Sequence, residues 1–190
     1  MYIRLLAPFA LYAFVFANHY VETSNKSSPF YELPANSTDT LYLVGHSVDL
    51  FKWRLTCVRT NYTSRQGEVV NRTLIFNYSK DFNETPEVEM SFPFQVTVPD
   101  VPIMFDLELN VTDSLVNYTG AQSTYRIIYY NDESMVLGDK MPTVSERAIC
   151  SLWVKENFTL EHQIPFMANL SFHTSCKNAL YYGYLHTCSK

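Results

Sequence analysis

The segment Glu87–Val98 reads EVEMSFPFQVTV and alternates without a break between apolar and polar positions. Apolar side chains occupy every second position from Val88 to Val98, and acidic, polar or proline residues fill the positions between them. Successive side chains of a β-strand point to opposite faces, so this period of two predicts a strand with one buried face and one face in water. A helix would instead repeat its apolar residues every three or four positions.

Seven further segments of similar character accompany this strand, joined mostly by short polar links and without helices between them. The eight predicted strands are Thr40–Leu50, Arg54–Tyr62, Val69–Tyr78, Glu87–Val98, Ile103–Val111, Ser123–Tyr130, Glu133–Lys140 and Ile149–Lys155. Consecutive short strands of this kind are typical of an all-β sandwich or an up-and-down barrel. Near the C-terminus, Gln163–Tyr181 is predicted to contain a short helix.

The N-terminus has the features of a secretory signal peptide. Arg4 precedes an uncharged apolar run, Leu5–Phe16, and Ala17 lies where a signal peptidase would cleave. The run is shorter than the roughly 20 residues that a membrane-spanning helix needs. We therefore predict a signal peptide over residues 1–17, a polar leader over 18–39 and one domain over 40–190, in a secreted, extracellular protein without a membrane anchor.

Glycosylation sequons (Asn-x-Ser/Thr) are unusually frequent, because ten of the thirteen asparagines begin one. The predicted acceptors are Asn25, Asn36, Asn61, Asn71, Asn77, Asn83, Asn110, Asn117, Asn157 and Asn169. In a secreted chain these positions are expected to face water and to carry N-linked glycans. They also identify the outer face of each strand, since side chains alternate between faces.

The four cysteines predict two disulfides, since an even number in a secreted chain normally pairs completely. Cys57, Cys150, Cys176 and Cys188 allow three pairings, and none has the CxxC spacing of zinc or thioredoxin-type sites. An immunoglobulin-like domain would enclose its Trp between paired cysteines, whereas Trp153 follows Cys150.

The function classes with the least support are nucleic-acid binding, metal binding and catalysis. The formal net charge is −5 and no basic patch is present. The five histidines are scattered without metal-binding spacing, and no nucleophile elbow, P-loop or Rossmann glycine pattern occurs. We expect no enzymatic activity, no metal, no cofactor and no nucleic-acid partner.

When the sequons face outward, the opposite faces of the strands are rich in aromatic residues and include one arginine. Arg72 lies between the sequons at Asn71 and Asn77 and falls on the inner face. A buried arginine without a partner is costly, so Arg72 is expected to meet a carboxylate of the protein or of a ligand.

Two interpretations fit this aromatic interior. The first is a filled core, and the second is a barrel that holds one small molecule. The predicted ligand-binding residues are Arg72, Tyr62, Phe76, Tyr78, Phe92, Phe94, Phe105, Tyr125, Tyr129 and Trp153.

Three short motifs and the last two cysteines resemble a known family, the tick salivary lipocalins, often called tick histamine-binding proteins. The motifs are Leu55-Thr56-Cys57-Val58-Arg59, Tyr129-Tyr130-Asn131-Asp132 and Cys150-Ser151-Leu152-Trp153-Val154, followed by Cys176 and Cys188. The resemblance implies a lipocalin-like eight-stranded antiparallel up-and-down barrel with a C-terminal helix. It also implies two disulfides, Cys57 with Cys188 and Cys150 with Cys176.

The resemblance further implies a salivary protein that sequesters a small host mediator, histamine or another biogenic amine, and so blunts host defence and inflammation. Amine-binding members surround an ammonium group with inward carboxylates and aromatic rings, which is favourable through charge pairing and cation–π contact. The residue after Cys150 is often acidic in the family and is Ser151 here.

No inward carboxylate is predicted on the second to fifth strands or on the eighth. The acids that could reach the mouth of the barrel lie near strand ends and are Asp39, Asp49, Glu133 and Asp139. The alternatives are therefore an anionic lipid mediator, such as a fatty acid or leukotriene, held by Arg72 with help from His46, or a host protein bound on the outer surface. A monomer is expected.

Overall fold

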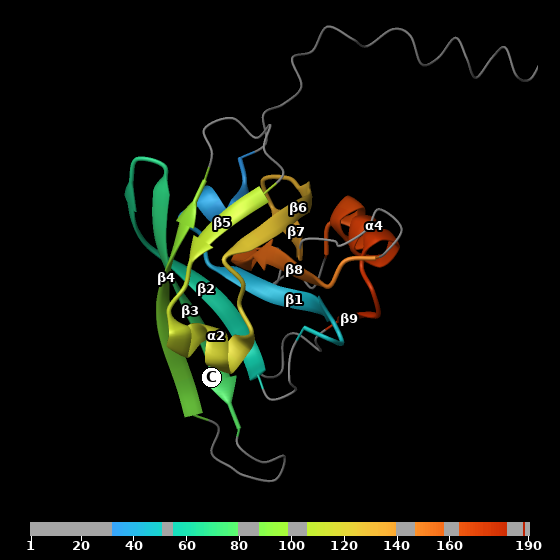
Figure 1. Cartoon of the computed structure of the whole chain (residues 1–190). Helices are drawn as coiled ribbons and strands as arrows, with labels where there is room; N and C mark the ends of the chain where they lie inside the picture. The colour runs from blue at the N-terminus through green and yellow to red at the C-terminus, as the bar shows by residue number, and fades with distance from the viewer. Residues whose placement is uncertain are drawn as a thin grey trace, which may run out of the picture. The chain divides into compact units, whose positions relative to one another are not determined.

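Nine strands, two α-helices and a 3₁₀ turn make up the described part of the chain, in a computed structural model (Figure 1). The structure describes residues 32–50, 55–79, 88–98, 106–139, 147–157, 164–181 and 188. The predicted signal peptide, most of the predicted leader, Asn25, Asn83 and Phe105 lie outside these residues.

The strands are antiparallel neighbours and close into a barrel. They are β1 (Leu41–Ser47), β2 (Leu55–Gln66), β3 (Val69–Tyr78), β4 (Val88–Thr97), β5 (Asp106–Asn110), β6 (Thr124–Tyr130), β7 (Ser134–Gly138), β8 (Cys150–Lys155) and β9 (Ala179–Tyr181). The order around the sheet is β2-β3-β4-β5-β6-β7-β8-β1-β9, and an additional pairing of β1 with β2 closes the ring. The eight predicted strands are confirmed, and β9 is an addition.

The hairpin β3–β4 shows how strand period and burial agree. Its register is regular from Val69 opposite Thr97 to Tyr78 opposite Val88. Phe94 and Val96 turn inward, whereas the intervening Gln95 is exposed, as the alternating sequence predicted. Because one face packs and the other meets water, a slip of one residue would bury the polar set, so the register is strongly specified.

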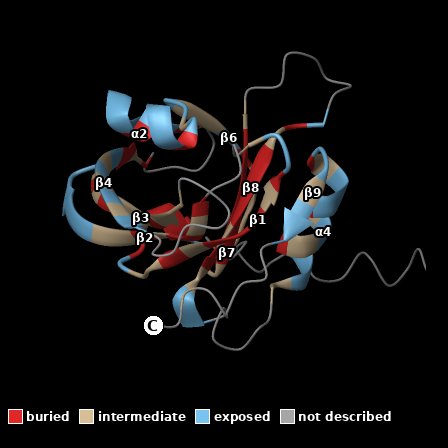
Figure 2. Cartoon of the chain, turned by 90° about the horizontal axis from the view of Figure 1, so that it is seen from below, coloured by how far each residue is buried: buried red, intermediate tan, exposed pale blue. Residues whose placement is uncertain are grey.

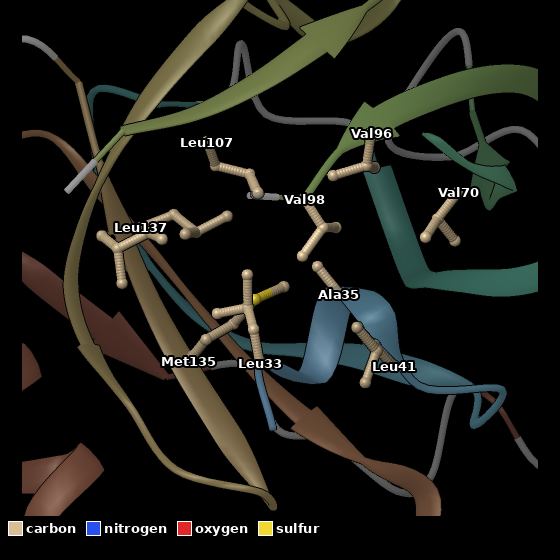
Figure 3. Packing of buried hydrophobic residues seen from close by; sticks show 10 residues of the cluster. Leu33, Ala35, Leu41, Val70, Val96, Val98, Leu107, Met135 and Leu137 are labelled. Carbon is tan, nitrogen blue, oxygen red and sulfur yellow. The ribbon is translucent and has the colours of Figure 1, made fainter. Parts of the chain in front are cut away.

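A 3₁₀ turn, η1 (Pro34–Asn36), closes one end of the barrel, which is called the floor below. Leu33 and Ala35 are buried there against apolar residues of several strands (Figure 3). The buried cluster comprises Leu33, Ala35, Leu41, Val70, Val96, Val98, Leu107, Ile127, Met135 and Leu137. The last residues of the predicted polar leader therefore belong to the barrel, because their apolar side chains fill its end.

A second short helix, α2 (Asp113–Thr119), lies over the opposite end, called the roof below. Its N-cap is Thr112, whose side chain accepts a hydrogen bond from the Leu115 amide, and its C-cap is Gly120 with a φ of 69°. Leu115 points into the barrel and is buried. This helix was not expected from the sequence, since Asp113–Thr119 lies in the link between two predicted strands.

Helix α4 (Phe166–Ser175) packs on the outside of the barrel, against β6, β7 and β8 (Figure 1). Ala168 and Phe172 are its buried residues, and Phe172 approaches β1 so closely that a Cβ at Gly45 would lie 2.8 Å from its ring. The predicted helical segment thus ends earlier than expected, and its last residues form β9 instead.

Two disulfides join the barrel to the C-terminal segment. Cys150 pairs with Cys176, which fixes the end of α4 to β8, and Cys57 pairs with Cys188. Both pairings implied by the family resemblance are confirmed.

The sequon asparagines in the described residues all lie outside the cavity. Asn110, Asn117 and Asn157 are exposed, and the half-buried ones are Asn36, Asn61, Asn71, Asn77 and Asn169. Exposed residues gather on α2, α4 and the outer side of β4, whereas buried residues line the inside of the strands (Figure 2). Within the same residues, no helix has the length and apolar character that crossing a membrane requires.

Candidate ligand-binding site

A cavity lies inside the barrel between the floor and the roof, with about 770 Å³ of space free of protein atoms, part of it open to solvent. Strands β1 to β8, η1 and α2 all contribute to the lining. It consists of Ala35, Leu41, Leu50, Val58, Thr60, Arg72, Leu74, Phe94, Val96, Leu107, Leu109, Leu115, Thr119, Ala121, Tyr125, Met135, Leu137, Ser151 and Trp153.

The lining is almost entirely aliphatic and aromatic. Its polar side chains are Thr60, Arg72, Thr119, Tyr125, Ser151 and the indole of Trp153. Among the described residues that line the cavity there is no Asp or Glu. The cavity therefore favours an apolar ligand with few polar groups, because an unpaired charge would lose its hydration without gaining a partner.

Arg72 faces inward and is 2% exposed, as the alternation of β3 predicted. Its Nε donates to Thr60 Oγ1 at 3.0 Å, and its Nη1 donates to the carbonyls of Ala35 and Ser37 at 3.3 and 2.7 Å. Its Nη2 donates to the carbonyls of Asp39 and Thr60 at 2.6 and 3.1 Å. All five N–H groups thus have protein acceptors.

The expectation that Arg72 needs a carboxylate is therefore wrong. Three carbonyls of the segment around η1, together with the hydroxyl and carbonyl of Thr60 on β2, satisfy the guanidinium instead. Burial lowers the pKa of Arg72 to about 10, so it keeps its positive charge at neutral pH. Whether Arg72 touches a ligand stays a prediction, but no N–H remains for a bidentate contact with an acid.

Of the hydroxyl groups in the lining, those of Ser151 and Tyr125 offer polar contact on the wall of the cavity. Trp153 Nε1 donates to Ser151 Oγ at 2.9 Å, within a strand where both side chains face inward. The Tyr125 hydroxyl accepts a hydrogen bond from the Gln122 amide at 2.9 Å. Burial raises the pKa of Tyr125, so its hydroxyl keeps its proton and can donate it to a ligand.

Of the ten predicted ligand-binding residues, four lie in the lining, namely Arg72, Phe94, Tyr125 and Trp153. Tyr62 packs against the floor cluster of Figure 3. Phe76, Tyr78 and Phe92 form a separate aromatic cluster toward the roof, where Tyr78 and Phe92 contact the ring of Tyr118 on α2.

Tyr129 does not belong to the cavity wall. The pairing of β6 with β7 shifts register between Ile127 and Tyr129. Ile127 belongs to the interior cluster, but Tyr129 packs with Phe172 of α4 in the cluster outside the barrel. A bulge reverses the faces of all residues beyond it, which strict alternation could not anticipate.

The acids that were expected near the mouth have other partners. Asp39 pairs with Lys155 at 2.9 Å, Asp49 pairs with Lys177 at 3.1 Å, and Asp139 accepts the Ile149 amide at 2.9 Å. These side chains and Glu133 are absent from the cavity lining.

His46 is also absent from the lining, and its Nδ1 lies 2.7 Å from the Ser47 carbonyl. Burial lowers its pKa. In the part of the chain that is described, no group of three metal-binding side chains gathers at one place.

Comparison with known proteins gives two relatives. Japanin from Rhipicephalus appendiculatus is 34% identical over 145 residues, which cover 76% of this chain and 77% of that protein. Japanin-like-RS from Rhipicephalus sanguineus is 31% identical over the same shares. The chain belongs to the tick salivary lipocalin family. No family model matches the sequence.

A solved structure agrees with this membership of the tick salivary lipocalins. Japanin from Rhipicephalus appendiculatus bound to cholesterol superposes with a TM-score of 0.72 at 32% identity, over 82% of this chain and 98% of that one. The closed barrel, its helices and its disulfides are those of the lipocalin-like fold. The family membership and the cavity together make this chain a small-molecule-binding lipocalin of the type found in tick saliva.

Proposed function

We propose that this lipocalin is secreted and captures one largely apolar molecule of sterol type in its barrel. The observation that carries the proposal is the cavity lining, which is aliphatic and aromatic and contains no carboxylate among the described residues. Removal of such a molecule from the host would blunt host defence and inflammation, as family resemblance implies. The role is that of a binding protein rather than an enzyme.

The chemistry of the lining supports a sterol more than an amine. Apolar surface contributes about 25 cal/mol per Å² removed from water, and this term would dominate binding in such a cavity. A sterol has one hydroxyl group, for which Tyr125 and Ser151 provide hydrogen-bonding partners. The related Japanin was crystallised with cholesterol, a ligand of this class.

The two competing ligand classes have weaker support. Histamine would need a carboxylate to pair with its ammonium group, and the described lining provides only neutral oxygens and aromatic rings. A fatty acid or leukotriene would need a free cationic donor, but Arg72 donates to five oxygens of the protein. Amines and anionic lipids are therefore both included in the binding test.

The test is titration of lipid-stripped protein with cholesterol, arachidonate, a leukotriene, histamine and serotonin. Calorimetry and Trp fluorescence monitor the binding of each. We expect saturable one-to-one binding of cholesterol and no heat from either amine. Ala121→Trp, which fills the cavity beside the roof, should weaken cholesterol binding at least about tenfold. Val116→Trp on the exposed side of α2 is the matched control and should bind normally. Tight histamine binding without cholesterol binding would overturn the proposal.

A further inference from the structure

An exposed apolar face covers part of α4 and the neighbouring strand β9. Phe166 is 74% exposed, Leu170 is 45% exposed and Tyr181 is 39% exposed. Single exposed apolar residues are ordinary, but a group of large ones normally marks a surface that something covers. These three residues define what we call the α4 face; the helix and strand that carry them, α4 and β9, are neighbours in Figure 2.

A sequon lies at the edge of this face. Asn169 begins the sequence Asn-Leu-Ser on α4, three residues after Phe166. Side chains three positions apart in a helix are neighbours, and helical side chains lean toward the N-terminus, so Asn169 extends toward Phe166. Tyr181 also borders Asn169, since its hydroxyl donates to Asn169 Oδ1.

The hydrogen bond from Tyr181 holds the amide of Asn169 through its oxygen. An N-linked glycan is attached to the other amide atom, Nδ2, so the bond and the glycan do not compete. The ring of Tyr181 is itself fixed, because it contacts the rings of Phe172 and His173 at 5.6 and 5.1 Å between centroids. Asn169 therefore bonds to an aromatic residue of β9 and lies about one helical turn from Phe166.

We propose that Asn169 carries an N-glycan whose first sugars pack on the α4 face, against Phe166 and Tyr181. Pyranose rings present C–H groups on one face, and these groups bury well against an aromatic ring. Transfer from a lipid-linked oligosaccharide diphosphate forms the bond between Nδ2 and the first sugar, removes one amide proton and releases the lipid diphosphate. The glycan then covers the apolar surface instead of a partner protein.

The inference rests on the secretion proposed above but not on the ligand. To test the two proposals separately, residues 1–17 are replaced with the secretion leader of another protein. If the native leader does not direct secretion, that result then bears on the proposed function and not on the glycan. The experiment uses this protein from insect-cell medium. Ser171→Ala removes the sequon and keeps Asn169, and Phe166→Ala removes the predicted platform. Met167→Ala is the matched control, since Met167 is 51% exposed on the same helix but turned about 160° away from Asn169.

Glycopeptide mass spectrometry should find Asn169 occupied in the parent protein. The Tm decrease caused by Phe166→Ala should be at least about 2 °C larger in the glycosylated protein than in the Ser171→Ala background. Met167→Ala should cause the same decrease in both. An unoccupied Asn169, or equal effects of Phe166→Ala with and without the glycan, would overturn the proposal. A third outcome would also overturn the proposal: the protein without the glycan forms a dimer that depends on Phe166, while in the monomer the glycan does not change the effect of Phe166→Ala on Tm. In that case a second copy of the chain covers the α4 face.

Discussion

Arg72 holds the floor of the barrel in place. Its guanidinium joins β3 to the Thr60 carbonyl on β2 and to three carbonyls of the segment around η1. Hydrogen bonds from a charged donor are stronger than neutral ones, and the acceptors would be left unsatisfied in the interior without it.

Arg72→Met should therefore destabilise the protein by about 3 kcal/mol, which is roughly 6–12 °C in Tm for a chain of this size. Arg65→Met is the control, because Arg65 is exposed and bonds to Gly67 and Asn36 at the surface. Thermal unfolding followed by circular dichroism gives the answer. If Arg72→Met left Tm unchanged and abolished arachidonate binding, Arg72 would instead be a residue that binds an anionic ligand.

His46 should make stability depend on pH. Burial lowers its pKa below the ordinary 6.5, so the unfolded chain takes up a proton more readily than the folded protein. Stability is then highest above about pH 6.5 and decreases as the pH falls toward the lowered value, below which this loss is complete. We expect a shallower decrease of Tm between pH 7 and 5 in His46→Gln than in the parent. Equal slopes in the parent and in His46→Gln would rule out His46 as the cause.

The inward position of Arg72 could be predicted from sequence, because sequons on either side identified the outer face of its strand. Its partners could not, since four of the five acceptors are backbone carbonyls, which every residue has. Residue types therefore indicated a buried charge but pointed to the wrong kind of partner.

At the scale of elements, α2 decides how the cavity is covered. Gly120 ends this helix in the left-handed region at a φ of 69°, and its position is open enough that an added Cβ would lie 4.0 Å from the Leu50 carbonyl. Gly67 in the β2–β3 turn has a similar φ of 61° and no neighbour within 4 Å. The two glycines differ mainly in place, since one is at the roof and the other is at a hairpin.

Gly120→Ala and Gly67→Ala should each cost about 1 kcal/mol of stability, because a side chain disfavours this backbone conformation. Only Gly120→Ala should also speed ligand release, since it loosens the roof. Stopped-flow measurement of cholesterol dissociation separates the two effects. Equal dissociation rates in both variants would show that α2 does not retain the ligand.

The sequence contained signals for α2 that a strand-centred interpretation missed. Thr112 as N-cap and Gly120 after the last turn are ordinary helix boundaries, but the helix between them has only seven residues and one apolar side chain in the barrel. The bulge in β6 had no comparable signal, and for that reason Tyr129 was assigned to the wrong face.

At the scale of the whole molecule, the two disulfides hold different parts of the barrel. The bridge between Cys150 and Cys176 closes a loop of 26 residues around α4, and the bridge between Cys57 and Cys188 spans 131 residues. Residue reasoning alone left three pairings open, and only the family resemblance selected this one.

Replacing Cys150 and Cys176 with Ala should cost up to about 3.5 kcal/mol, and replacing Cys57 and Cys188 should cost up to about 5 kcal/mol. Only the first change should free α4, because that bridge fixes its end to β8. Hydrogen exchange with mass spectrometry should then show lost protection over Phe166–Ser175 and retained protection in β2–β4. A protected α4 would mean that Phe172 alone suffices to hold it.

The closure of the barrel by β1 has a consequence for how the chain is made. β1 shares only two paired positions with β2, at Leu41 and Tyr42, and makes its longer ladder with β8. The hydrogen bond from the Cys150 amide to Ser47 Oγ joins positions 103 residues apart. Synthesis proceeds from the N-terminus, so β1 emerges long before β8, and the edge of β1 that pairs with β8 stays unpaired until β8 has been made. Among the described strands, the first to leave the ribosome is thus one of the last to complete its pairing.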